Sequence, residues 1–144
     1  MGMFNAIDAA ASGLTAERLR MDVISNNIAN VNTTRTAEGG PYRRQVVVFS
    51  PRAGSSRFGQ LLASELDAGA GVRVVGINKD QSPLKMVYEP QHPDANADGY
   101  VAMPNVNIVA EMVDMITATR AYEANVTAVS AAKTMAAKAL EIGR

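Results

Sequence analysis

The chain contains no cysteine and no tryptophan, and its 144 residues include only three phenylalanines and four tyrosines. Without cysteine, disulfide bonds, thiol catalysis and zinc sites with cysteine ligands are excluded. The scarcity of large aromatic side chains leaves few anchors for a deep core. Because a small domain buries a modest fraction of its surface, the composition predicts a single domain whose stability depends on partners.

The chain also lacks an excess of either charge, since 14 Lys and Arg residues balance 14 Asp and Glu residues. Phosphate binding needs a basic surplus, so the balance argues against nucleic acid as the main partner. No run of about 18 apolar residues occurs, so we expect no transmembrane helix and no direct membrane insertion. The first basic residue is Arg18, and Asp8 stands where a secretory signal is basic, so we expect no cleaved signal peptide.

Charges of one sign are nevertheless separated along the chain. The 35–57 segment has five arginines and one acidic residue, Glu38, whereas the 86–119 segment has five acidic residues and no Lys or Arg. Such segments are often solvated loops. The alternative is that the basic loop of one copy contacts the acidic segment of another.

What the sequence does have is apolar residues at alternating spacings of three and four near both ends. The N-terminal series is Phe4, Ile7, Ala11, Leu14, Met21 and Ile28. The C-terminal series is Ile108, Met112, Met115, Thr119, Tyr122, Val126, Val129, Lys133, Ala136 and Leu140. This spacing is typical of a helix that packs along a partner helix, and polar interruptions in such a series can fix its register.

The pattern therefore predicts one helix over about residues 5–28 and a second that runs to about residue 142. The first should end in the 26–34 segment, because asparagine favours caps and turns, and four asparagines fall within seven residues there. Asn105 or Asn107 is a suitable N-cap for the second.

The middle of the chain has a sequence pattern typical of strands and loops. Strands are predicted over 42–49, 71–77 and 84–88, where β-branched residues gather, and a short helix is predicted over 58–66. The 90–104 segment contains three prolines and reads as irregular. The predicted fold class is α+β, with long N- and C-terminal helices paired as an antiparallel coiled coil and a small β-rich middle region.

The 94–105 segment resembles a calcium-binding EF-hand loop in part. The matching positions are Asp94, Asn96, Asp98 and Gly99. Asn105 stands at the twelfth position, where the loop needs a bidentate Glu, so a polar turn is the better interpretation and a calcium-binding module the alternative.

Catalytic motifs are missing. The sequence has no P-loop, no G-x-S-x-G and no dinucleotide fingerprint, and its only histidine, His92, lies between Gln91 and Pro93 without a nucleophile or ligand cluster nearby. The sequence predicts neither an enzyme nor a cofactor or metal site.

Three segments together resemble the flagellar axial proteins of bacteria, the rod and hook family. The first is Ser25-Asn26-Asn27-Ile28-Ala29-Asn30-Val31-Asn32-Thr33, which is similar to the Ala-Asn-x-x-Thr signature of that family. The second runs from Tyr88-Glu89-Pro90 through Gly99-Tyr100-Val101 to Pro104-Asn105-Val106-Asn107, and the third is the 111–125 segment around Arg120-Ala121-Tyr122. In a chain this short, the second and third segments are typical of the proximal-rod members. One departure is the 34–40 insertion after the first motif, which leaves Tyr42-Arg43 as the comparable aromatic-basic pair.

The resemblance implies a structural subunit of the basal-body rod, the drive shaft that transmits torque and surrounds the export channel. Its partners would be copies of itself and other rod proteins, with the base of the MS ring and export gate as a further neighbour. Export would use the flagellar type III apparatus without cleavage of a signal, which would place the protein in the rod that spans the periplasm. Residues 1–31 and 107–144 would form a helical inner-tube domain and residues 32–106 a β-rich middle region.

We expect assembly contacts from the family motifs and the basic loop. The candidate residues are Asn27, Ala29, Asn30, Thr33, Arg43, Arg44, Pro104, Asn105, Arg120, Tyr122 and Asn125. In particular, the charge separation predicts that Arg43 and Arg44 contact the acidic stretch around Asp94 and Asp98 of a neighbouring copy.

Overall fold

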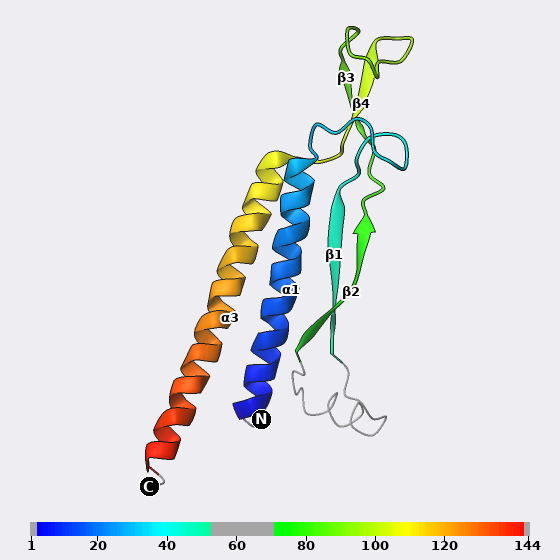
Figure 1. Cartoon of the computed structure of the whole chain (residues 1–144). Coiled ribbons are helices and arrows are strands. Elements are labelled where there is room, and N and C mark those ends of the chain that lie inside the picture. Colours follow the sequence, from blue (N-terminus) through cyan, green and yellow to red (C-terminus); the bar gives the residue numbers. More distant parts are fainter. Residues whose placement is uncertain (1–2, 53–70, 143–144) are drawn as a thin grey trace. The chain divides into compact units, whose positions relative to one another are not determined.

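The computed structural model describes residues 3–52 and 71–142 (Figure 1). Helices lie at the two ends of this chain and short strands lie between them, so the predicted α+β fold class is confirmed. The elements in chain order are α1 (Met3–Ala29), β1 (Gln45–Pro51), β2 (Val72–Lys79), β3 (Lys85–Tyr88), β4 (Tyr100–Met103) and α3 (Ile108–Ile142). The helix predicted over residues 58–66 falls outside the described residues.

Local hydrogen bonds set the helix boundaries where the sequence placed them. Asn107 caps α3, because its Oδ1 accepts the backbone N–H groups of Val109 and Ala110 at 3.0 and 3.4 Å. At the end of α1, the side chain of Asn30 donates to the backbone oxygen and the Oδ1 of Asn26, at 2.9 and 2.8 Å. The asparagine-rich exit is therefore a turn built from side-chain amides.

The strands form two separate two-stranded sheets, β1 with β2 and β3 with β4. β3 and β4 are antiparallel, with Lys85 opposite Met103 and Tyr88 opposite Tyr100. The prediction that residues 90–104 are irregular was wrong at β4. Glycine at position 99, at φ 78°, closes the turn so that its oxygen accepts the N–H of Glu89 at 2.9 Å, and the chain returns alongside β3.

The chain divides into two compact units. The first unit comprises Met1–Leu19, Val48–Gly76 and Ala118–Arg144, and the second comprises Arg20–Val47 and Ile77–Thr117. The start of α1 therefore belongs with the later part of α3, and the end of α1 with the start of α3. This is the arrangement of an antiparallel helix pair, and α1 and α3 lie side by side (Figure 1).

The predicted contact face of α3 was wrong by one position at alternate residues of the series, whereas Met115, Tyr122, Val129 and Ala136 are half-buried as expected. Met112 and Val126 are 55 % and 44 % exposed, whereas the preceding residues Glu111 and Asn125 are buried and half-buried. The same shift places Ala118 and Ala132 inside. On α1 the buried residues are Ser12, Ala16, Val23, Ile24 and Asn27.

Small residues explain this choice of face. Ala118 is fully buried and Ala16 is 3 % exposed, and a Cβ placed on Gly13 would lie only 2.8 Å from Nδ2 of Asn125. Side chains of this size let two helix backbones approach closely, which dispersion and close packing favour. Several larger apolar residues near the start of α3, among them Met112, Val113 and Ile116, are left on its outside. Neither helix in the described part of the chain has an apolar stretch sufficient to cross a membrane.

Candidate functional site

The most constrained site in the second unit is a buried side-chain amide at the end of α1. Asn27 is 1 % exposed, and its Nδ2 donates to the Gln45 oxygen and to Oε2 of Glu111, both at 2.9 Å. Its Oδ1 accepts the Gln45 N–H and the Tyr42 hydroxyl, both at 2.9 Å. Two donors and two acceptor positions are all used, so this amide fixes the start of β1 against α1.

A buried carboxylate completes the site from α3. Glu111 is 0 % exposed, and its Oε1 accepts from Nε of Arg44 at 2.6 Å. Arg44 also donates through Nη2 to Asp114 at 3.2 Å. The hydrogen bond that Arg44 donates to Glu111 is the main reason that the pKa of Arg44 is raised. A charge can be buried here because it is both paired and hydrogen-bonded.

A second asparagine joins the same residues to the loop between β2 and β3. Oδ1 of Asn105 accepts the backbone N–H of Arg44 at 2.9 Å. Its Nδ2 donates to the backbone oxygens of Asp80 and Ser82 at 3.2 and 3.4 Å. We refer to Asn27, Tyr42, Arg44, Asn105 and Glu111 as the junction cluster.

Burial also perturbs the phenol of the junction cluster. Desolvation raises the pKa of Tyr42, and the negative charge of Glu111 raises it further. Tyr42 is therefore held neutral as a donor to Asn27. The cluster has donors, acceptors and an ion pair that all satisfy one another, an arrangement that holds segments in place.

Each family motif found in the sequence contributes to this cluster. Asn27 lies in the first motif, Asn105 in the second and Glu111 in the third. The structure thus brings together three of the predicted residues, Asn27, Arg44 and Asn105, through contacts within one chain. Sequence reasoning missed Glu111 and Tyr42 as members of the site. In the sequence, Glu111 is one of the five acidic residues of the 86–119 segment, and nothing local marks it as buried.

The acidic hairpin loop is likewise occupied by its own chain. Asp94 accepts from the Thr34 hydroxyl at 2.9 Å and pairs with Arg35. The hydrogen bond from Thr34, followed by the charge of Arg35, lowers the pKa of Asp94. Arg44 and Asp94, two residues expected to face a neighbouring copy, are therefore engaged internally.

Residues 94–99 of the 94–105 segment lie in the turn of the β3–β4 hairpin, and Tyr100–Met103 form β4. Oδ1 of Asn96 accepts the backbone N–H groups of Asp98 and Tyr100 at 3.0 and 2.9 Å. Within residues 3–52 and 71–142, no three His, Asp or Glu side chains are grouped as a metal ion would require.

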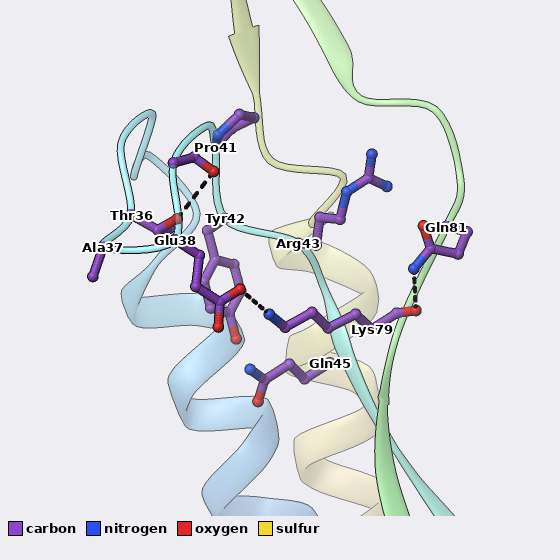
Figure 2. Close-up of a pocket in the computed structure, with 10 residues that line it drawn as sticks. Thr36, Ala37, Glu38, Pro41, Tyr42, Arg43, Gln45, Lys79 and Gln81 are labelled. Carbon is purple, nitrogen blue, oxygen red and sulfur yellow. Dashed lines mark hydrogen bonds and ion pairs between the residues drawn. The ribbon is translucent and has the colours of Figure 1, made fainter.

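A polar hollow of about 460 Å³ opens beside the junction cluster (Figure 2). Figure 2 shows Glu38 and Lys79 pointing toward one another, and they form an ion pair. This pairing lowers the pKa of Glu38. Arg43 also lines the hollow, and its Nη1 donates to the Asp80 oxygen at 3.3 Å.

The other predicted residues lie at the ends of elements or on α3. Asn30 Oδ1 accepts the Thr33 hydroxyl at 3.1 Å, Ala29 is the exposed last residue of α1, and Pro104 is buried. Arg120, Tyr122 and Asn125 belong to α3 in the first unit. There Arg120 is exposed, and Tyr122 and Asn125 are half-buried.

A second fixed point lies in the first unit, where a serine of α1 meets the start of β2. The Ser12 hydroxyl donates to the Ala9 oxygen at 2.7 Å and accepts the Val72 N–H at 3.0 Å. Gly71 has a φ of 93°, and a Cβ there would lie 2.4 Å from the Ser12 oxygen. The strand can approach α1 this closely only with glycine at position 71.

The start of α3 presents an uncovered apolar face in the second unit. Its five residues, which we call the outer face of α3, are Ile108, Val109, Met112, Val113 and Ile116. They are 44 %, 70 %, 55 %, 58 % and 56 % exposed. A contiguous apolar group of this kind is typical of a protein–protein contact.

Comparison with known proteins assigns this architecture to a family. Residues 7–35 match the family profile described as flagella basal body rod protein, and residues 97–142 match the profile of the flagellar basal body rod FlgEFG protein C-terminal region. These two matches cover the helices that form the helix pair, together with β4. They define a class of structural axial proteins of the flagellum, not an enzyme.

Relatives that match over their full length identify the family within this class. The chain is 55 % identical to the flagellar basal-body rod protein FlgC of Borreliella burgdorferi, over 99 % of this chain and 98 % of the relative. It is 48 % identical to FlgC of Bacillus subtilis and 40 % identical to FlgC of Escherichia coli O6:H1, over all of both chains in each case. The chain belongs to the FlgC family of flagellar basal-body rod proteins and is a structural subunit of the rod.

Proposed function

We propose that the chain polymerises with copies of itself and with other rod proteins to form the proximal part of the drive shaft. In this position it would surround the export channel and transmit torque. A subunit contact that joins two different surfaces and does not close into a ring generates a filament. Torque would then pass through many repeated contacts between subunits.

The outer face of α3 is the observation that carries this proposal. Val109 and Val113 are 70 % and 58 % exposed on a helix whose opposite face is already packed within the chain. Covering such apolar side chains stabilises an assembly by roughly 25 cal/mol for each Å² removed from water. A helix with apolar residues on two faces is suited to a position between an internal and an external partner.

We propose that the helices and the middle of the chain form two different regions of the rod. Residues 1–31 and 107–144 would form the inner-tube domain, and residues 32–106 would form the outer, β-rich region. The junction cluster supports this proposal, because Asn27 and Glu111 link the helix pair to the start of β1 by hydrogen bonds of 2.9 Å. Such a link would let the outer region and the helices turn as one body.

Substitution on the outer face tests the proposal. Val113→Asp should abolish rod assembly and motility while leaving the helical circular dichroism of the purified chain unchanged, because the site is exposed in the single chain. Val113→Ile, which keeps the same site apolar, is the matched control and should leave assembly intact. Normal motility with Val113→Asp would contradict the proposal.

For the predicted residues that are exposed, we propose lateral contacts with neighbouring subunits. Arg120 is exposed on α3, and Asp98 is exposed in the hairpin turn. The predicted contact of Arg43 with the acidic loop of a neighbour can be tested by reversing both charges. Arg43→Glu should block assembly, and Asp98→Lys in the same chain should restore it in part. Assembly that is normal in the arginine variant would remove this contact from the account.

We also propose export through the flagellar type III apparatus and residence in the rod across the periplasm, with the MS ring and export-gate base among the neighbours. The N-terminal helix α1 would then be retained in the mature protein. Mass spectrometry of rod-bound protein should find peptides from the first residues of α1. A mature N-terminus beyond α1 would contradict export without cleavage.

A further inference from the structure

The β3–β4 hairpin has one open edge, and its backbone geometry can be read from one hydrogen bond. β3 belongs to a two-stranded sheet, so one of its sides is unpaired among residues 3–52 and 71–142 (Figure 1). Glu89 donates its N–H to Gly99 at 2.9 Å, so Glu89, Val87 and Lys85 direct their backbone groups toward β4. The backbone groups of Met86 and Tyr88 then face away from the hairpin.

On the opposite edge of the hairpin, the backbone groups of Tyr100 are bonded within the chain itself. Tyr100 donates its N–H to Oδ1 of Asn96 and accepts the Asn96 N–H, both at 2.9 Å. No such bond joins Met86 or Tyr88 to another of the described residues outside the β3–β4 ladder. These two side chains are also 54 % and 64 % exposed. The open edge therefore combines free backbone groups with exposed Met and Tyr, residue types enriched in protein contacts.

The order of charges along this edge is complementary to itself. The sequence reads Lys85-Met86-Val87-Tyr88-Glu89. In an antiparallel pairing of two copies centred on Val87, Lys85 of each chain lies directly opposite Glu89 of the other. Both side chains are exposed, and neither forms an ion pair with another residue in the described part of the chain.

We propose that β3 is a contact surface for a second copy of this chain, joined through an antiparallel β3–β3 pair. Met86 of one copy and Tyr88 of the other would exchange backbone hydrogen bonds, which gives four such bonds across the two-fold axis. The Met and Tyr side chains would pack together on one face. On the other face, each Lys would pair with the Glu of the second copy.

The proposed β3–β3 pair is short and joins two copies only. Pro90 has no N–H group for the next position of the ladder, so the paired segment ends at Glu89. A small contact of this kind belongs among weak interfaces. Because a two-fold contact uses the same surface on both chains, it joins two copies and does not extend a filament. The inference is therefore independent of the proposed contacts along the rod.

An engineered cysteine on the two-fold axis provides the test, because the natural chain has no cysteine. Two facing residues at the centre of this pair would have Cα atoms about 4.5 Å apart, within the range for a disulfide. Val87→Cys should form a disulfide-linked dimer under mild oxidation at high protein concentration. Ala97→Cys, exposed in the turn of the same hairpin, is the matched control and should cross-link at least about tenfold more slowly, because its sulfurs are not held together.

Charge reversal in the Val87→Cys background makes the test specific. Lys85→Glu alone and Glu89→Lys alone should each lower dimer formation about tenfold, because two pairs become repulsive. Mixing these two reversed chains should restore cross-linking between them, since each reversed position again faces an opposite charge. Equal cross-linking of Val87→Cys and Ala97→Cys would overturn the proposal. So would cross-linking insensitive to both reversals, or cross-linking of Val87→Cys only to other rod proteins.

Discussion

Replacing Glu111 by glutamine exchanges one carboxylate oxygen for an NH₂ group. This replacement should destabilise the second unit more than the same exchange at any other polar contact in the unit. The two carboxylate oxygens accept from two different donors, Nδ2 of Asn27 at 2.9 Å and Nε of Arg44 at 2.6 Å. A glutamine amide has one oxygen and one NH₂ group, so one of the two contacts becomes donor against donor. The side chain is 0 % exposed, so water cannot replace the lost acceptor.

The expected cost follows from these contacts. Leaving a buried donor without an acceptor costs about 1–3 kcal/mol, and breaking a buried ion pair costs about 3–5 kcal/mol. The Arg44 side chain is 27 % exposed, so part of its charge remains solvated. We therefore expect Glu111→Gln to lower the free energy of unfolding by about 2–4 kcal/mol.

The matched control is Asp114→Asn, which removes a charge that also pairs with Arg44. Asp114 is 37 % exposed and lies 3.2 Å from Arg44 Nη2, so its loss should cost less than about 1 kcal/mol. Urea unfolding followed by helical circular dichroism measures both variants. Hydrogen exchange at the Gln45 amide, which donates to Asn27 at 2.9 Å, gives a local measurement in the same unit.

A cost of Glu111→Gln no larger than that of Asp114→Asn, with the Gln45 amide equally protected, would contradict this prediction. The junction cluster would then be a set of polar contacts without a role in holding β1 to the helices. A large cost confined to Glu111→Gln, with faster exchange at Gln45, is the expected result.

Three further predictions concern single positions. Gly71→Ala should lower stability by about 2 kcal/mol or more, because φ is 93° and the new Cβ would lie 2.4 Å from the Ser12 oxygen; an unchanged melting temperature would contradict this. Tyr42→Phe should cost about 1 kcal/mol in urea unfolding, since a buried amide oxygen loses one donor at 2.9 Å, and equal stability would show that the hydroxyl is dispensable. The pKa of Asp94 is lowered in the folded chain, so its hydrogen bond with Thr34 stabilises the fold at pH values above the ordinary carboxyl pKa. This stabilisation is lost as the pH falls through the pKa of the folded state. The stability of the wild type should therefore fall more steeply in acid than that of Asp94→Asn, and parallel stability curves would exclude the effect.

Local chemistry made the helices predictable. The asparagine-rich exit at Asn26 and Asn30 and the cap at Asn107 act within a few residues, so the sequence was enough to place them. The boundary of β1 was less predictable because it depends on distant partners. The strand was expected from residue 42, but it begins at Gln45, since Arg44 directs its N–H to Asn105.

The inward face of α3 was predicted less well for a physical reason. A shift of one position preserves the alternation of three and four, so periodicity alone does not select the face. Fully buried Ala118 and the charged Glu111 occupy the inner face, while Met112 and Ile116 stay outside. Apolar residues on the outside of a helix are what an external contact requires, and the expected apolar series therefore combined inner positions such as Met115 with outer ones such as Met112.

β4 was not predicted, because the residues of the strand itself do not indicate a strand. Tyr100–Met103 lies among prolines and glycine, and only its pairing with β3 makes it a strand. Among the predicted assembly residues, Asn27 and Asn105 proved to be parts of the junction cluster. The same motifs that identify the family thus hold the second unit together, and their role between subunits remains a prediction.

A density map of assembled basal bodies, fine enough to trace side chains, would show what covers the outer face of α3 in the rod. We expect Val109, Val113 and Ile116, which are exposed in the single chain, to be covered by a helix of a neighbouring subunit. A map in which these residues face solvent, with neighbouring subunits contacting the chain elsewhere, would contradict this expectation.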